Sequence, residues 1–202
     1  MKCYFFGSFN PIHLGHIEIA RRIKEQFAFD DIIFVPSYIP PHKHDLENYV
    51  HRLKMTELAV GEANTLDIES KLPIPSYTYR SIEKLKELDG TEKINFIIGF
   101  DQFFKIESWK EPVKLKENLK FIVIPRRFSN GQTINPRAFD YFKDRDYDFE
   151  IADVGFLDVS SNMIRKYVAT NQDITGLTTC EVKEYIEENG LYRNLVKCKS
   201  FG

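Results

Sequence analysis

Residues 7–16 (GSFNPIHLGH) constrain the fold of this 202-residue chain more than any other segment. They follow a short apolar run at residues 3–6 that is typical of a strand, and they precede apolar residues at helical spacing in residues 17–27. Strand, tight loop and helix in this order form an anion-binding unit, because unpaired backbone N–H groups and the helix dipole both favour negative charge before the helix. We therefore expect a phosphate site here.

Two histidines bracket this loop. His13 stands just ahead of the expected helix and His16 in its first turn, so both imidazoles are expected to reach the same anion. Gly7 and Gly15 let the backbone approach a ligand where a side chain would obstruct it. An isolated histidine pair near a helix start is more often a surface or capping feature, and it is the strand, loop and helix around this pair that favour a functional role.

Composition narrows the class of protein. A formal net charge of −2 argues against a general nucleic-acid binder, which usually carries a marked basic excess. Cys3, Cys180 and Cys198 are too far apart to suggest a disulfide framework or a zinc site. No apolar run approaches the roughly 18 residues of a membrane span, and no secretory signal pattern is present. We expect one soluble, cytoplasmic domain over residues 1–202.

Apolar runs and amphipathic segments alternate along the chain, which predicts an α/β fold. The expected strands are residues 3–6, 31–36, 94–99, 121–125 and 149–154, with a further candidate at 65–69; the expected helices are 17–27, 48–61, 78–88, a run from about 161, and part of 178–192. We expect a doubly wound, Rossmann-like parallel sheet with helices on both faces and a small C-terminal helical segment. In such sheets ligands bind beyond the carboxyl ends of the strands. Residues 129–136 are expected to be a surface loop.

A second candidate phosphate motif lies at residues 158–168 (DVSSNMIRKYV). Ser160 and Ser161 precede a helical run and so occupy N-cap positions. Capping alone would explain two serines at this place. Arg165, one helical turn beyond Ser161, allows hydroxyl, backbone N–H groups and guanidinium to converge on one polyphosphate.

Residues 13–16 (HLGH) resemble the H-x-G-H signature of the nucleotidylyltransferase superfamily. With Phe9, Pro11 and Ile12 in place, the longer string is most similar to that of the bacterial nicotinate-nucleotide adenylyltransferases. Residues 159–165 resemble the I-S-S-T-x-I-R motif of that family, although Asn162 stands where the family usually has threonine. That difference removes one hydroxyl contact, while an amide can still donate a hydrogen bond.

The resemblance implies an ATP site and its catalytic residues. Its residues would be Gly7, Ser8, Phe9, His16, Lys43, Ser160, Ser161 and Arg165, with His13, His16 and Arg165 catalytic. Lys43 belongs to residues 40–43 (PPHK), which match a stretch common in this family. Magnesium is expected to be held through the ATP phosphates and water, without a dedicated carboxylate cage.

The resemblance also implies a pyridine mononucleotide site. Its residues would be Ser8, Phe9, Tyr77, Thr78, Asp101, Trp109 and Arg126. Residues 75–79 (PSYTY) are similar to the segment that meets the nicotinate carboxylate, and a G-x-D followed by tryptophan supplies a ribose contact and an aromatic face. The residues alone have other interpretations. Thr78 and Asp101 are equally typical of helix caps. Trp109 is equally typical of core packing, and Arg126 of a solvated surface residue.

A metal site is the alternative interpretation of a cluster of histidines and a carboxylate, His42, His44, Asp45 and His51. The cluster lacks the i, i+4 spacing that places two histidines on one helix face. We therefore expect no protein-bound metal.

The expected reaction is transfer of the adenylyl group of ATP to nicotinate mononucleotide, giving deamido-NAD and pyrophosphate in NAD biosynthesis. Two alternatives stay open: another superfamily adenylyl- or cytidylyltransferase with nicotinamide mononucleotide or pantetheine phosphate as acceptor, and a non-catalytic nucleotide-binding protein. The sequence does not decide between the acid and the amide pyridine mononucleotide. An NAD-dependent oxidoreductase is disfavoured, because no G-x-G-x-x-G follows any expected strand. No nucleic acid or membrane partner is expected, and a homo-oligomer is compatible with the sequence.

Overall fold

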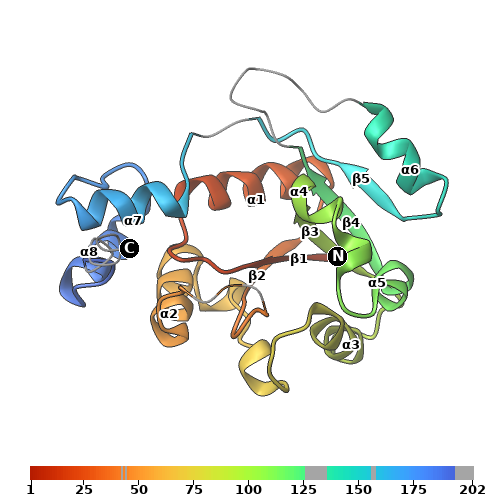
Figure 1. The fold of residues 1–202 in the computed structure, drawn as a ribbon, viewed down its shortest axis with the longest axis horizontal. Coiled ribbons are helices and arrows are strands. Elements are labelled where there is room, and N and C mark those ends of the chain that lie inside the picture. The colour runs from red at the N-terminus through yellow and green to blue at the C-terminus, as the bar shows by residue number, and fades with distance from the viewer. Residues whose placement is uncertain (42, 44, 126–135, 156–157, 194–202) are drawn as a thin grey trace, which may run out of the picture.

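The computed structural model describes residues 1–41, 43, 45–125, 136–155 and 158–193, and within them the strands form one parallel sheet (Figure 1). The strands are β1 (Lys2–Gly7), β2 (Asp31–Pro36), β3 (Ile94–Gly99), β4 (Leu119–Ile124) and β5 (Phe149–Ile151). Their order is β2-β1-β3-β4-β5. Because β2 and β3 lie on opposite sides of β1, the chain reverses direction across the sheet between β1 and β3, which confirms the doubly wound topology.

Helices connect and flank the strands. They are α1 (Leu14–Gln26), α2 (Tyr49–Val60), α3 (Thr78–Asp89), α4 (Phe100–Phe103), α5 (Pro112–Asn118), α6 (Asp140–Lys143), α7 (Ser161–Ala169) and α8 (Cys180–Glu188), with 3₁₀ turns η1 (Glu62–Asn64), η2 (Glu69–Lys71), η3 (Ile106–Ser108) and η4 (Pro136–Phe139). Figure 1 shows α1 on one side of the strands and α3 and α5 on the other. The expected C-terminal helical segment corresponds to α7 and α8.

Two buried clusters, one on each face of the sheet, form the core. Along β1, Cys3 and Phe5 point to one face and Tyr4 to the other, as the alternation of a strand requires. The first cluster includes Ile23 of α1 and Ile164 of α7, and the second includes Leu85 of α3. Burial on both faces explains why these strands read as nearly continuous apolar runs.

Strand register brings the ends of neighbouring strands to one level. Gly7 at the end of β1 lies opposite Pro36 at the end of β2, and Gly99 at the end of β3 lies opposite Ile124 at the end of β4. The loops that follow these strands therefore meet at one edge of the sheet, where ligands bind in folds of this kind.

The expected strand at residues 65–69 is wrong. Thr65 forms a single bridge to Phe34, after which the chain leaves the sheet and enters η2. Asp67 instead accepts hydrogen bonds from Tyr49 and Ser70, so its side chain is committed to local polar contacts. Other strand boundaries also differ from expectation: β1 extends one residue further at each end, β4 begins two residues early at Leu119 and ends one residue early at Ile124, and β5 ends three residues early at Ile151.

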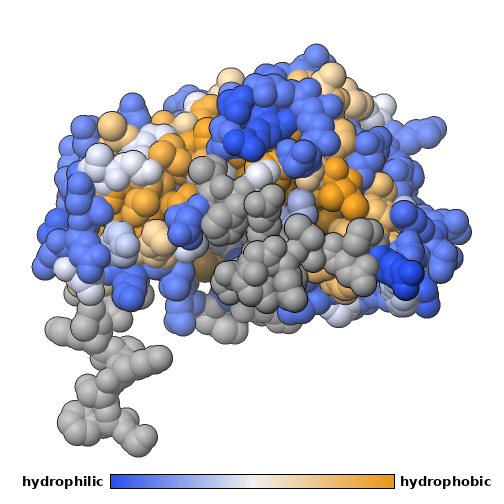
Figure 2. All heavy atoms as spheres, turned by 90° about the horizontal axis from the view of Figure 1, so that it is seen from above, coloured by the Kyte–Doolittle hydropathy of each residue, from blue (hydrophilic) through white to orange (hydrophobic). Residues whose placement is uncertain are grey.

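Seen from above, the molecule presents hydrophilic residues along most of its rim and hydrophobic residues toward the middle (Figure 2). Within the part of the chain that the structure describes, no helix is long and apolar enough to cross a membrane. Residues 129–135 of the expected surface loop, and Cys198, lie outside the described residues.

Candidate active site

The loop between β1 and α1 is held in its shape by Phe9. Phe9 has a left-handed backbone (φ 42°), and its ring lies over Gly7 so closely that a Cβ on Gly7 would fall 2.7 Å from the ring. Gly7 is therefore required at this position. The Phe9 side chain is 2% exposed and packs against Phe5 and Phe34. Its ring is a core element, and it presents no free face on which a ligand could stack.

His13 and His16 occupy the positions expected of them, at the N-cap and in the first turn of α1. Their rings stack with centroids 3.7 Å apart. The backbone N–H of His13 donates to Nδ1 of His16 over 3.3 Å, so the proton of a neutral His16 resides on Nε2. Nδ1 of His13 is buried and has no hydrogen-bond partner within the described residues.

Burial keeps both imidazoles neutral. It lowers the pKa of His13 from 6.5 to about 4. It also lowers the pKa of His16 well below the usual value, and the repulsion that a charged His16 would meet from a protonated His13 and from Lys43 lowers it further. At neutral pH, His16 therefore acts as an uncharged hydrogen-bond donor through Nε2.

His16 lines a cleft of about 470 Å³ at the carboxyl end of β1. The described residues that line it are Ser8, Phe9, Asn10, His16, Lys43, Asp45, Leu46, Ser161 and Arg165. The structure therefore brings together residues that the sequence places up to 157 positions apart, from Ser8 to Arg165. Of the expected ATP-site residues, Gly7, Ser160 and the catalytic candidate His13 are not part of this lining.

The cleft is rich in cations. Nζ of Lys43 donates to Oγ of Ser8 over 2.7 Å. Burial lowers the pKa of Lys43, and the charges of Arg52 and Arg165 add to this effect, so three cations lie near one another. Asp45 is the one carboxylate among the described lining residues. Such an excess of positive charge suits a polyanion.

Arg165 reaches the cleft from α7. Nη1 donates to the backbone oxygen of Asn10 over 2.7 Å, and Nη2 lies 3.4 Å from Oδ1 of Asn162. Arg165 is thus oriented against the same loop that carries the histidines. Asn162, at the position of the family threonine, contacts the guanidinium through its acceptor oxygen.

The two serines before Arg165 have different roles. Ser160 is the N-cap of α7, and its Oγ accepts the backbone N–H of Met163, as expected. Ser161 is already the first helical residue, so its expected N-cap position is wrong. Its Oγ donates to the backbone oxygen of Pro11 over 2.8 Å, which ties α7 to the loop before α1.

The C-terminal part of the chain fastens the same loop at three further points. The Tyr192 hydroxyl donates to Oδ1 of Asn10, the Thr178 hydroxyl donates to the backbone oxygen of Ile12, and the Leu14 N–H donates to the backbone oxygen of Leu177. Asn10 is 3% exposed and Tyr192 is 6% exposed. Sequence reasoning missed these residues, because their partners are more than 160 positions away.

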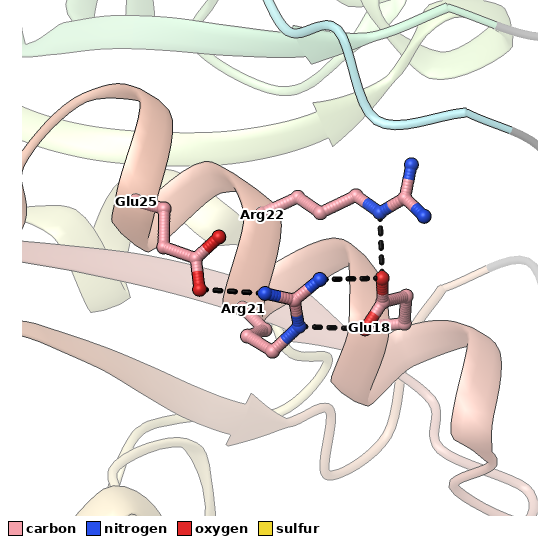
Figure 3. Close-up of polar contacts among 4 residues, drawn as sticks. All are labelled: Glu18, Arg21, Arg22 and Glu25. Atoms are coloured by element: carbon pink, nitrogen blue, oxygen red, sulfur yellow. Dashed lines mark hydrogen bonds and ion pairs between the residues drawn. The ribbon is translucent and has the colours of Figure 1, made fainter.

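Helix α1 also supports the segment that leads to α7. A Cβ on Gly15 would fall 2.9 Å from Cγ1 of Val159 and 3.0 Å from the His13 ring, so only glycine permits this approach. On the outer surface of α1, Glu18 and Glu25 both pair with Arg21 (Figure 3). Arg22 also pairs with Glu18 through Nε, and the end of its guanidinium points toward the segment after β5.

Of the residues expected at the pyridine site, Ser8 and Phe9 line this cleft, whereas Tyr77, Thr78, Asp101 and Trp109 are not part of its described lining. The N-cap of α3 is Tyr77, and Thr78 is its first residue, so Thr78 is not a cap. Asp101 lies within α4, whose N-cap is Gly99, so the alternative in which Asp101 caps a helix from Gln102 is also wrong. Trp109 is half-buried against the second core cluster.

Arg126, His42 and His44 lie outside the described residues. Within the described ranges, no group of three histidine, cysteine, aspartate or glutamate residues is arranged to hold a metal ion. His51, from the cluster considered for a metal, instead places Nδ1 2.9 Å from the Tyr185 hydroxyl of α8.

Comparison with known proteins assigns the chain to a family. Residues 4–184 match the model of the cytidylyltransferase-like family. A probable nicotinate-nucleotide adenylyltransferase of Staphylococcus epidermidis is 36% identical over 93% of this chain and 95% of its own length. The nicotinate-nucleotide adenylyltransferase of Bacillus subtilis is 32% identical over 94% and 97%.

Among solved structures, the nicotinic acid mononucleotide adenylyltransferase of Plasmodium falciparum complexed with NaAD superposes with a TM-score of 0.76 at 24% identity, covering 95% of this chain and 96% of that one. This likeness confirms the fold. Taken with the full-length relatives and the paired histidines at the start of α1, it leads to one assignment: the chain belongs to the cytidylyltransferase-like family and, within it, to the nicotinate-nucleotide adenylyltransferases.

Proposed function

We propose that the cleft between the β1 loop and α7 is where this chain transfers the adenylyl group of ATP to nicotinate mononucleotide. The observation that carries this assignment is the convergence of His16, Lys43 and Arg165, from three separate segments, on one cleft. A triphosphate placed there would meet one neutral donor and two cations.

The acceptor's own 5′-phosphate is the nucleophile. A phosphate monoester has a second pKa near 6 and is largely ionised at neutral pH, so no general base is required. One of its oxygens forms a bond to the α-phosphorus of ATP while the bond from that phosphorus to the bridging oxygen breaks, and pyrophosphate leaves. The products are deamido-NAD and pyrophosphate.

The protein contributes alignment and charge stabilisation. We assign His16 Nε2–H to an α-phosphate oxygen, where a donor matters most as charge develops during transfer. Lys43, Ser161 and Arg165 are assigned to the β- and γ-phosphates. His13, stacked behind His16 and buried, would act by holding the His16 ring rather than by touching substrate.

Magnesium enters this reaction as MgATP. The donor set of the cleft is mainly cationic and neutral, with Asp45 as the carboxylate of the described lining, which does not fit a protein-built magnesium cage. The ion would be held by phosphate oxygens and water. The residues described here therefore need only bind and orient the complex.

We assign the acceptor to the start of α3, which carries Tyr77 and Thr78, and to the segment after β3, which carries Asp101 and Trp109. Nicotinate mononucleotide is favoured over the amide because the relatives of this chain are named for it. Product formation would place the enzyme in cytoplasmic NAD biosynthesis.

A panel of acceptors tests this function. Purified protein with MgATP is offered nicotinate mononucleotide, nicotinamide mononucleotide or pantetheine phosphate, and pyrophosphate release and dinucleotide mass are measured. We expect nicotinate mononucleotide to give the highest kcat/KM. Faster turnover with another acceptor would reassign the substrate, and tight ATP binding without pyrophosphate release would make the chain a nucleotide-binding protein.

A further inference from the structure

Arg52 is a buried cation that the reaction described above does not use. It lies on α2, is 1% exposed, and donates every described hydrogen bond to backbone oxygens. Burying a guanidinium is costly unless its donors are satisfied, so this placement needs a structural or functional reason. The identities of its partners supply one.

The Arg52 guanidinium joins two loops at the carboxyl edge of the sheet, the one between β1 and α1 and the one between β2 and α2. Nη1 donates to the backbone oxygen of Ser8 over 2.8 Å and to that of Ser37 over 2.7 Å. Nη2 donates to the oxygen of Tyr38 over 3.0 Å, and Nε to that of Glu47 over 2.9 Å. The planar fork of arginine can hold, at once, carbonyls that follow β1, that follow β2 and that precede α2. A lysine ammonium cannot match this geometry.

Glu69 holds the same peptide from the opposite side. It is 3% exposed, and its Oε2 accepts the backbone N–H of Tyr38 over 2.9 Å. The N–H of Tyr38 therefore bonds to a buried carboxylate while its carbonyl bonds to the buried Arg52. Oε1 of Glu69 also accepts a hydrogen bond of 3.3 Å from Ser81 of α3.

The loops that Arg52 and Glu69 hold contact residues on both sides of the proposed site, the side for ATP and the side for the acceptor. On the ATP side, Ser8 accepts the hydrogen bond from Lys43. On the acceptor side, the Ile39 N–H donates to Oγ of Ser76 over 3.0 Å, and the Ser76 N–H donates to the oxygen of Ile39 over 2.8 Å. Ser76 directly precedes Tyr77 and Thr78.

We propose that Arg52 and Glu69 are positioning residues that set the β1 and β2 loops, and through them the ATP side and the acceptor side of the site, at a fixed separation. In-line transfer needs the attacking oxygen and the α-phosphorus aligned, so a small shift between the two sides reduces turnover strongly. This inference rests on the proposed function for the identity of the acceptor. Neither residue touches substrate.

Arg52→Lys and Glu69→Gln test this proposal, and Thr56→Val is the matched control. Thr56 is fully buried on the same helix, and its Oγ1 donates only to the backbone oxygen of Arg52 over 2.8 Å, away from the loops. Thr56→Val should lower the melting temperature and leave both kinetic constants of the folded enzyme unchanged. Glu69→Gln preserves shape, so it remains informative if Arg52→Lys fails to fold.

The readouts are the dissociation constants of MgATP and of nicotinate mononucleotide, each added alone, together with kcat. We expect both dissociation constants to rise and kcat to fall by about tenfold or more in Arg52→Lys, and by a smaller factor in Glu69→Gln. Lower thermal stability with unchanged binding and kcat per folded molecule would overturn the proposal. So would a change confined to one substrate.

The activity of the wild-type enzyme distinguishes a failure of this proposal from a failure of the proposed function. Absence of deamido-NAD formation by wild type would refute the function. The MgATP arm would still test whether Arg52 fixes the β1 loop, because ATP binding is measured without turnover. Normal wild-type turnover with unaltered variants would refute the positioning role alone.

Discussion

The backbone N–H of His13 faces Nδ1 of His16 at 3.3 Å, so the other ring nitrogen, Nε2, carries the proton of the neutral ring. The two histidines of the motif therefore differ in kind. We propose that His16 supplies the donor to the ligand, whereas His13 supplies the backbone contact and the stacked ring that orient it.

Two replacements of His16 should distinguish the roles of its two ring nitrogens. The amide of asparagine falls near Nδ1 and that of glutamine near Nε2, so His16→Asn keeps the contact to His13 while His16→Gln keeps a donor toward the ligand. We expect His16→Asn to lose about a hundredfold or more in kcat and His16→Gln to lose less. Steady-state kinetics with melting temperatures check this. Equal losses would show that the Nε2 donor is not what matters.

Acid should destabilise the native state through His13. Its pKa is 6.5 when unperturbed and about 4 in the folded protein, so between these values the unfolded chain binds a proton that the native state does not. The contribution is complete above pH 6.5 and is lost as the pH falls toward 4, by about 1.4 kcal/mol per pH unit at most. His13→Phe keeps a ring without titrating. Urea unfolding should show the free-energy difference between wild type and His13→Phe changing over this window, and a constant difference would contradict the assignment.

Gly15→Ala should destabilise the protein, although glycine to alanine within a helix usually stabilises it by up to about 1 kcal/mol. The added Cβ would lie 2.9 Å from Val159, so we expect a loss of about 1–3 kcal/mol and lower turnover as the segment before α7 is displaced. Gly99→Ala, where a Cβ meets open space, should change stability by less than about 0.5 kcal/mol. Adding Val159→Ala should restore part of the loss, and no restoration would rule out this contact as the cause.

Arg165→Lys should lower kcat/KM for ATP by about tenfold or more. Lysine cannot keep the contact to Asn10 and also reach phosphate, because it lacks the forked donors of arginine. Lys166→Met, at the neighbouring exposed position, removes a charge from the same helix and should leave the kinetics unchanged. If both variants lose activity alike, the loss in Arg165→Lys reflects a disturbance of α7 and not the missing forked donors.

Removal of magnesium should abolish turnover without loosening the fold. In the described part of the chain, no group of three histidine, cysteine, aspartate or glutamate side chains is arranged to hold a metal ion. We therefore expect a chelator to leave the fold unchanged. Pyrophosphate release should stop with excess EDTA and return with added Mg²⁺, while the melting temperature without ATP stays the same. A lower melting temperature in EDTA would indicate a protein-bound metal.

Much of the fold, and part of the lining of the cleft at the end of β1, could be predicted from local sequence. Strands buried on both faces leave apolar runs, so β1 to β4 were recognisable, and residues 13–16 identified the start of α1 because a strand and a glycine flank them. The segment at 65–69 looked equally suitable as a strand. The segment leaves the sheet where Asp67 accepts hydrogen bonds from Tyr49 and Ser70, and the strand propensities of its residues do not include such contacts.

Tertiary partners account for what could not be predicted. Arg52 reads as an ordinary exposed helix cation, because nothing in its neighbourhood along the chain reveals the four carbonyls that surround it. Phe9 was predicted to contact both substrates, and only the packing of Phe5 and Phe34 against it shows that its ring belongs to the core. The roles assigned to Tyr77, Thr78, Asp101 and Trp109 stay predictions.

The hydrogen bond from Tyr192 to Asn10 spans 182 positions of the chain. A nascent polypeptide emerging from the ribosome can form β1, α1 and β2 early, since their contacts are local, but the loop between β1 and α1 acquires this fastening only after Tyr192, which follows α8, has been synthesised. Truncation beyond α8 would then yield a folded sheet with an unfinished nucleotide cradle.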